Sequence, residues 1–76
     1  MEDKIINIVS EVCEDESIKD NVDVDLIDSG LLDSLAFINL IAMLENEFNI
    51  EIQPTQVAPE NWRTTRSIIE LIKRLI

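Results

Sequence analysis

The stretch Gly30-Leu31-Leu32-Asp33-Ser34-Leu35 stands where an acidic segment gives way to the longest apolar periodic segment of the chain. The residues that follow carry apolar side chains at helical spacing, which places them on one core-facing stripe: Phe37, Leu40, Ile41, Leu44 and Phe48. Asp33 is a good N-cap, because its carboxylate can accept hydrogen bonds from first-turn amides. We therefore expect a helix over residues 34–48 whose first residue is Ser34, with the hydroxyl directed to solvent.

Spacing alone leaves two interpretations of Ser34 open. Asp-Ser before an apolar helix is a frequent start signal, so Ser34 can be part of a plain helix cap. The alternative is that the exposed hydroxyl of Ser34 is a point of covalent attachment. The surrounding sequence decides between them.

Leu31-Leu32-Asp33-Ser34-Leu35, followed by an apolar helix ending in Leu44-Glu45-Asn46-Glu47-Phe48, resembles the Asp-Ser-Leu signature of acyl carrier proteins. Length, acidity and the order of elements extend the resemblance over nearly the whole chain. It implies that Ser34 carries 4'-phosphopantetheine, whose terminal thiol holds an acyl or aminoacyl group as a thioester, and that Asp33 supports the attachment. A phosphodiester at Ser34 would also meet a helix N-terminus, which favours anions.

Within this family the chain looks most like the D-alanyl carriers, which serve D-alanylation of teichoic acids. Further segments suggest this: Glu11-Val12-Cys13, Pro54-Thr55 and Asn61-Trp62 with Thr64 just beyond. Leu35 and Glu47 depart from the subfamily, in which Phe and a basic residue are common at these positions. A dedicated carrier of another small pathway, or of fatty acid synthesis, therefore stays open. The resemblance implies three partners: a phosphopantetheinyl transferase, an adenylating ligase that charges the thiol, and a downstream acyltransferase.

The composition restricts both the size of the fold and the kind of partner. Seventy-six residues allow a single domain, residues 1–76, with a small core. The net charge of −10 argues against nucleic acid or an anionic membrane as ligand and favours a basic partner. Fifteen of the sixteen acids precede residue 63, whereas four of the six bases follow residue 62. We expect these C-terminal bases to neutralise part of their own domain.

Other features of the sequence bear on compartment and chemistry. Met1-Glu2-Asp3 lacks the basic region of a signal peptide, and no apolar run approaches the roughly 18 residues of a membrane span. A single cysteine cannot form an internal disulfide, which fits a reducing cytoplasm. We also expect the chain to be a monomer. The chain has no histidine, no Gly-rich phosphate loop and no metal-ligand cluster. We therefore expect a substrate of other enzymes and not a catalyst.

Periodicity predicts an all-α fold. The resemblance implies a small acyl-carrier-like bundle of three main helices plus a short helix, with a long loop between the first two helices. The expected elements are a helix over residues 2–14, a self-packed acidic loop over 15–33, the helix over 34–48, short helices near 54–57 and 59–62, and a last helix from Thr64 or Thr65 to about Leu75. Residues 49–53 alternate like a strand but have no partner strand, so they are expected to form a tight connection. Gly30 is the natural position for a positive φ.

The loop aspartates, Cys13 and Trp62 can each be interpreted as structural residues or as functional ones. Asp23, Asp25 and Asp28 resemble calcium ligands, but an EF-hand starting at Asp23 would need Gly and Glu where the chain has Asp28 and Ser34. Cys13 is expected to be a small, half-buried hydrophobe. Trp62 is expected to be a packing residue, although the resemblance also implies contact with a carried group or partner.

The second helix has an unusual exposed face. Carriers of this family usually place acids early on this helix, whereas this chain has Ala36 and Asn39 there. We expect partners to dock with more apolar contact, through Leu35, Ala36, Ile38, Asn39 and Ala42, while the acidic loop supplies the steering charge. Two alternatives remain: the exposed apolar residues only cover the neighbouring loop, or the domain is a non-carrier acidic interaction module that receives no covalent group.

Overall fold

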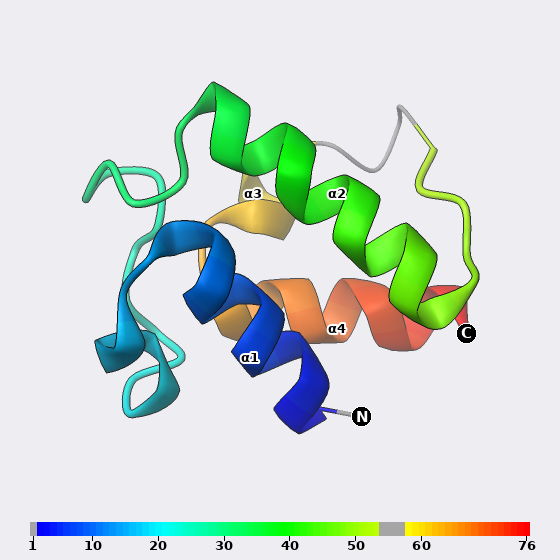
Figure 1. Cartoon of the computed structure of the whole chain (residues 1–76), viewed down its shortest axis with the longest axis horizontal. Coiled ribbons are helices and arrows are strands. Elements are labelled where there is room, and N and C mark those ends of the chain that lie inside the picture. Colours follow the sequence, from blue (N-terminus) through cyan, green and yellow to red (C-terminus); the bar gives the residue numbers. More distant parts are fainter. Residues whose placement is uncertain (1, 54–57) are drawn as a thin grey trace.

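The structure, a computed structural model, describes residues 2–53 and 58–76. Within these residues all regular elements are helices (Figure 1). In chain order they are α1 (Glu2–Cys13), the 3-10 helix η1 (Glu16–Lys19), α2 (Ser34–Phe48), α3 (Pro59–Trp62) and α4 (Thr65–Leu75). The predicted all-α bundle with a long loop between its first two main helices is confirmed. The short helix expected near residues 54–57 lies outside the described residues.

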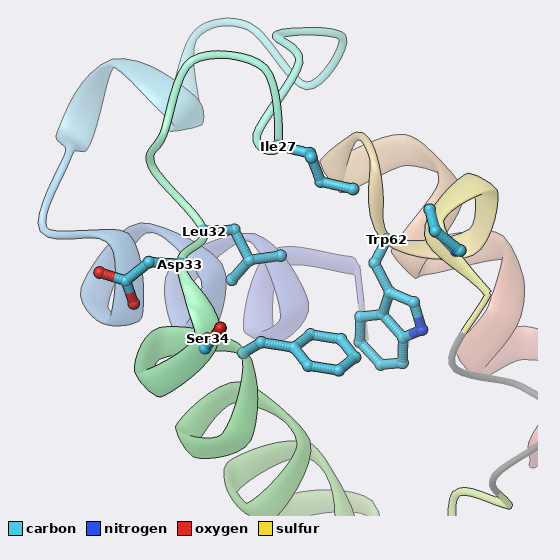
Figure 2. A pocket seen from close by; sticks show the side chains of 7 residues that line it. Ile27, Leu32, Asp33, Ser34 and Trp62 are labelled. Atoms are coloured by element: carbon cyan, nitrogen blue, oxygen red, sulfur yellow. The ribbon is translucent and has the colours of Figure 1, made fainter.

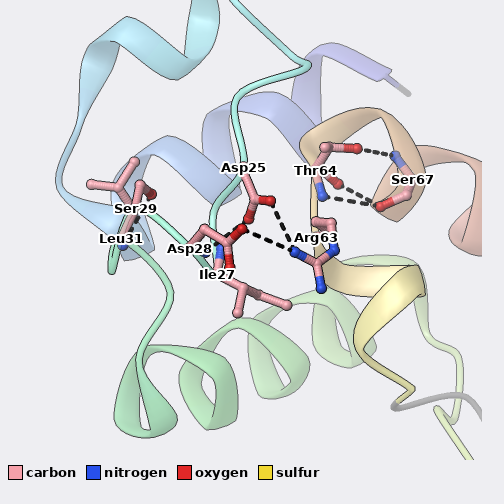
Figure 3. Close-up of polar contacts among 8 residues, drawn as sticks. All are labelled: Asp25, Ile27, Asp28, Ser29, Leu31, Arg63, Thr64 and Ser67. Atoms are coloured by element: carbon pink, nitrogen blue, oxygen red, sulfur yellow. Dashed lines mark hydrogen bonds and ion pairs between the residues drawn. The ribbon is translucent and has the colours of Figure 1, made fainter.

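Local sequence signals set the helix ends. Glu14 adopts a left-handed φ of 54°, so α1 ends one residue earlier than expected. Asn49, with φ 52°, ends α2 in the same way, and its amide donates to the Glu45 carbonyl. Pro59 occupies the first turn of α3, where its missing N–H costs nothing. Thr64 caps α4 in a reciprocal arrangement with Ser67 (Figure 3).

One hydrophobic core joins the three long helices. In Figure 1, α2 and α4 lie on opposite sides of the bundle and α1 contacts both. The fully buried apolar side chains of these helices and of α3 are Ile5, Val9, Leu40, Leu44, Trp62, Ile68, Leu71 and Ile72. The stripe predicted for residues 34–48 faces this core: Leu40 and Leu44 are fully buried in it, and Phe37, Ile41 and Phe48 are partly buried against it. No helix in the described ranges has the length and apolar character that crossing a bilayer requires.

The acidic loop between α1 and α2 is ordered by its own contacts. Ile18, Leu26 and Leu32 are buried in the core. The Leu26 amide donates to the Arg63 carbonyl at 2.7 Å, and the Leu32 amide donates to the Leu26 carbonyl at 2.9 Å. Gly30 has φ 79°, as expected for a turn that needs a left-handed residue. The loop is therefore attached to the junction between α3 and α4.

Ion pairs connect the C-terminal bases to acids far earlier in the chain. Arg63 Nη1 lies 2.9 Å from Asp25 Oδ2 and 3.5 Å from Asp28 Oδ2, Arg66 Nε lies 2.7 Å from Asp23 Oδ1, and Lys73 Nζ lies 2.6 Å from Glu2 Oε2. The expected internal neutralisation is confirmed. Because these pairs are largely solvated, each contributes little to the stability of the fold. Their main effect is to determine where the remaining negative charge lies.

Residues 49–53 form a connection and no strand, as expected. Ile52 is buried and Ile50 is half-buried, so both are anchored toward the core. The Ile52 amide donates to Glu45 Oε2 at 2.9 Å. A side chain of α2 thus satisfies the backbone that a partner strand would otherwise pair.

Candidate functional site

The start of α2 has the geometry that the sequence predicts. Asp33 is extended, with φ −84° and ψ −178°, and its Oδ1 accepts a hydrogen bond from the Ala36 amide at 2.8 Å. The Phe37 amide donates to the Asp33 carbonyl at 2.8 Å, which closes the first helical turn. Asp33 is therefore the N-cap, and Ser34 is the first residue of the helix.

Ser34 is exposed, and its hydroxyl makes no hydrogen bond with another described residue. The capping role belongs to Asp33, so Ser34 is not needed for it. The amides of the first helical turn and the positive end of the helix dipole lie beside this hydroxyl and favour a negative substituent. The chain has no histidine to act as a general base for Ser34, and Asp33 Oδ1 accepts the Ala36 amide. The geometry suits a hydroxyl that another enzyme modifies.

An apolar recess opens directly beside Ser34. Its volume is about 240 Å³, and its walls come from the loop, from α2 and from α3: Ile27, Leu32, Phe37, Pro59 and Trp62, with Asp33 and Ser34 at the rim (Figure 2). Ligand pockets for drug-sized molecules usually measure about 300–1,000 Å³. The recess is therefore of a size that suits a small apolar group.

Trp62 has a structural role and also borders the site. Its side chain is only 1% exposed, which confirms the packing interpretation. Its ring lies edge-to-face with Phe37 at a centroid distance of 5.1 Å and an interplanar angle of 86°, so the two rings form one wall of the recess (Figure 2). The same tryptophan thus fills the core and faces the neighbourhood of Ser34.

Asp25 holds the loop wall of this recess in place. Its Oδ1 accepts from the amides of Ile27 and Asp28 at 3.0 and 2.8 Å, while its Oδ2 accepts from Arg63 Nη1 at 2.9 Å (Figure 3). The Asp28 amide, the Arg63 guanidinium and the Ile27 amide together lower the pKa of Asp25 below its usual value. Ile27 is therefore positioned against α3 by a carboxylate that is stabilised in its charged form.

The acids that resemble calcium ligands are engaged elsewhere. Asp25 and Asp28 contact Arg63, and Asp23 contacts Arg66 through two hydrogen bonds of 2.7 and 3.2 Å. Within residues 2–53 and 58–76, no group of three acidic, cysteine or histidine side chains is arranged to hold a metal ion. These aspartates serve as partners of arginine in this fold.

Cys13 is buried at the end of α1 and is not disulfide-bonded. Burial, with smaller contributions from the charges of Asp15 and Asp33, raises the pKa of the Cys13 thiol to about 11. The thiol is therefore protonated at neutral pH, which confirms that Cys13 acts as a small hydrophobe.

The predicted partner-binding residues divide between a groove and open surface. A groove of about 530 Å³ lies between α1 and α2; its lining comprises Glu11, Val12 and Glu14 on one side and Asp33, Leu35, Ala36, Asn39, Ala42 and Met43 on the other. Four of the five predicted residues are in this lining, whereas Ile38 is 63% exposed outside it. Leu35 is 69% exposed, and Ala36 is half-buried.

Sequence reasoning did not identify most of the recess or the α1 side of the groove. Ile27, Leu32, Phe37 and Pro59 read only as core or turn residues, because nothing in their spacing shows that they meet beside Ser34. Glu11 and Glu14 lie on polar positions of the first helix. The sequence did contain an indication that the two glutamates have a role in binding, because the last turn of α1 contains no basic residue to balance their charge.

Comparisons with known proteins identify relatives over nearly the whole chain. Residues 3–72 match the family described as "Phosphopantetheine attachment site". The chain is 34% identical to a D-alanyl carrier protein of Abiotrophia defectiva over 76 residues, which cover 100% of this chain and 96% of that protein. It is 32% and 31% identical to D-alanyl carrier proteins of Bacillus licheniformis and Bacillus subtilis, each over 72 residues, which cover 95% of this chain and 92% of the relative.

Proposed function

Since the chain belongs to the acyl carrier protein family, whose cofactor is 4'-phosphopantetheine bound to a serine, we propose that Ser34 is its attachment residue. The observation that carries this proposal is the exposed hydroxyl at the first position of α2, beside a separate residue, Asp33, that caps the helix. A plain helix start needs only one of these two side chains. The other is left available for modification.

The residues around Ser34 fit the proposed group in two respects. A phosphodiester on Ser34 Oγ would lie at the N-terminus of a 15-residue helix, where the first-turn amides and the dipole stabilise an anion. The recess beside it offers apolar walls to a short apolar portion of the group or to a small cargo. When bound, phosphopantetheine supplies a terminal thiol that holds the cargo as a thioester.

We further propose that the cargo is D-alanine and that the pathway is D-alanylation of teichoic acids. Support comes from the relatives named as D-alanyl carrier proteins, with which this chain aligns over 95% or more of its length. The size of the recess, about 240 Å³, also favours a small cargo. The same observation weighs against the alternative of a carrier for long fatty acyl chains.

As a carrier, the chain is a substrate of partner enzymes and not itself a catalyst. The proposed partners are a phosphopantetheinyl transferase, an adenylating D-alanine ligase and an acyltransferase, which engage the chain in turn in the cytoplasm. The chain is proposed to act as a monomer. Its binding to each partner should be weak and rapidly reversible, since a shuttle must leave one enzyme to reach the next.

The test is the intact mass of the protein after incubation with a phosphopantetheinyl transferase and coenzyme A. Ser34→Ala is compared with Ser29→Ala, a matched change at another exposed serine close by in the same loop region. We expect the wild type and Ser29→Ala to gain one phosphopantetheinyl unit and Ser34→Ala to gain none. Loading of Ser34→Ala would overturn the proposal by placing the attachment at another residue. Failure of the wild type to load would overturn it and favour the acidic interaction module.

A further inference from the structure

The ion pairs of this protein leave its negative charge unevenly distributed. Arg63, Arg66 and Lys73 all pair with acids of the loop or of the first turn of α1. These contacts lie on the side of the molecule formed by the loop and α4. The loop acids were expected to steer partners, but three of them face arginines and are partly neutralised.

The groove between α1 and α2 has acids without such compensation. Glu11 and Glu14 are exposed on its α1 side and form no ion pair with any described residue. They also lie at the C-terminal end of α1, where the helix dipole disfavours negative charge, and the last turn of that helix contains no base. The two glutamates therefore bring no stabilisation to α1 and present negative charge to an approaching cation.

The opposite side of the same groove is mostly apolar, with Asp33 and Asn39 as its polar residues. Leu35 is the most exposed large apolar side chain of the described residues, and Ala42 and Met43 continue the surface along α2. Exposed apolar area bordered by charge is typical of a surface that is covered by a partner. The groove thus combines an apolar wall and an acidic wall facing each other.

We propose that this groove binds a basic amphipathic segment of the partner enzymes, with its apolar side chains on Leu35 and Ala42 and its Lys or Arg side chains facing Glu11 and Glu14. This inference rests on the proposed function, because it assigns the docking surface of the proposed carrier. Charge complementarity selects the occupant, since an acidic segment would be repelled by both glutamates. Glu11 and Glu14 then supply steering charge in addition to that of the loop acids.

The groove and the recess lie close together, so a partner can occupy the groove while a group attached to Ser34 occupies the recess. Asp33 lines both the groove and the recess, so the two hollows lie on either side of the start of α2. Ser34 lines the recess, whereas its neighbours Asp33 and Leu35 line the groove, so a partner seated in the groove lies next to the attachment position and leaves the recess open. A group on Ser34 can therefore remain in the recess until the partner draws it out.

The test compares two pairs of substitutions that remove the same charge. Glu11→Gln with Glu14→Gln changes the groove, whereas Glu47→Gln with Glu51→Gln changes two exposed acids at the other end of α2 and just beyond it. The readouts are KM and kcat for loading of the apo protein by a phosphopantetheinyl transferase, at several salt concentrations. We expect the groove pair to raise KM roughly three- to tenfold with little change in kcat and with a weaker salt dependence. The control pair should stay near the wild type.

A binding measurement makes this inference independent of loading. The Ser34→Ala protein is titrated with the same transferase, and amide shifts are followed by NMR with and without the groove substitutions. We expect shifts at Leu35, Asn39 and Ala42 and a weaker dissociation constant in the groove variant. If both pairs of substitutions weaken binding equally, the effect comes from net charge alone and the proposal is overturned. Absence of amide shifts along the groove would overturn it as well. Failure of Ser34 loading with intact groove binding would overturn only the proposed attachment.

Discussion

Replacing Asp33 by alanine removes the acceptor that satisfies the Ala36 amide at 2.8 Å and leaves the first turn of α2 without a cap. Loss of an N-cap costs about 1 kcal/mol, and loss of a negative charge at the helix N-terminus adds about 0.3–1 kcal/mol. For a domain of this size, about 1 kcal/mol lowers the thermal midpoint by roughly 4–8 °C. We therefore expect Asp33→Ala to melt roughly 5–15 °C below the wild type.

Asp33→Asn separates the cap from the charge. Asparagine caps as well as aspartate, so Asp33→Asn should lose only the dipole contribution and melt within a few degrees of the wild type. The resemblance to acyl carriers implies that the carboxylate also supports loading of Ser34. We expect Asp33→Asn to be loaded more slowly by a phosphopantetheinyl transferase, although it is folded.

Two assays on the same three proteins decide the matter. Circular dichroism at 222 nm gives the thermal midpoints, and intact mass against time gives the loading rates. If Asp33→Asn melts as low as Asp33→Ala, the side chain does not stabilise the helix through the cap. If Asp33→Asn loads at the wild-type rate, the carboxylate has no part in the attachment.

Four further predictions concern charge, burial and the recess. The Arg66 guanidinium holds the pKa of Asp23 below its usual value, so this pair stabilises the fold above about pH 4, and the stabilisation is lost as the pH falls through the lowered pKa. The free energy of unfolding in urea should therefore fall more steeply from pH 6 to pH 3 in the wild type than in Arg66→Gln. Identical pH dependences of the two proteins would contradict the pairing. The net charge of −10 predicts a thermal midpoint that rises with added NaCl, and a midpoint that stays flat would mean that self-repulsion is small. With its pKa at about 11, Cys13 should react with iodoacetamide at pH 8 far more slowly in native protein than in urea, and equal rates would show that the thiol is accessible. Trp62, the only tryptophan, lines the recess, so loading of Ser34 should shift its fluorescence emission, whereas an unchanged spectrum would place the attached group outside the recess.

The sequence alone predicts the local features of this protein correctly. Apolar side chains at i, i+3 and i+4 reveal each main helix, because the helical period is a property of neighbouring residues. Asp33, Pro59 and Thr64 act within one helical turn of their own positions, so the ends that they define are also readable from the sequence. The exposed first position of Ser34 follows from the same local rules.

The tertiary structure decides which distant residues meet. Arg63 and Asp25 are 38 residues apart, and Arg66 and Asp23 are 43 residues apart, so composition predicts that such pairs form but not which acids they choose. The walls of the recess come from the loop, α2 and α3, and the groove combines α1 with α2. Periodicity reports only which face of a helix is apolar. How helices pack depends on the shapes of all the side chains between them, so the surroundings of Ser34 emerge only when the core is assembled.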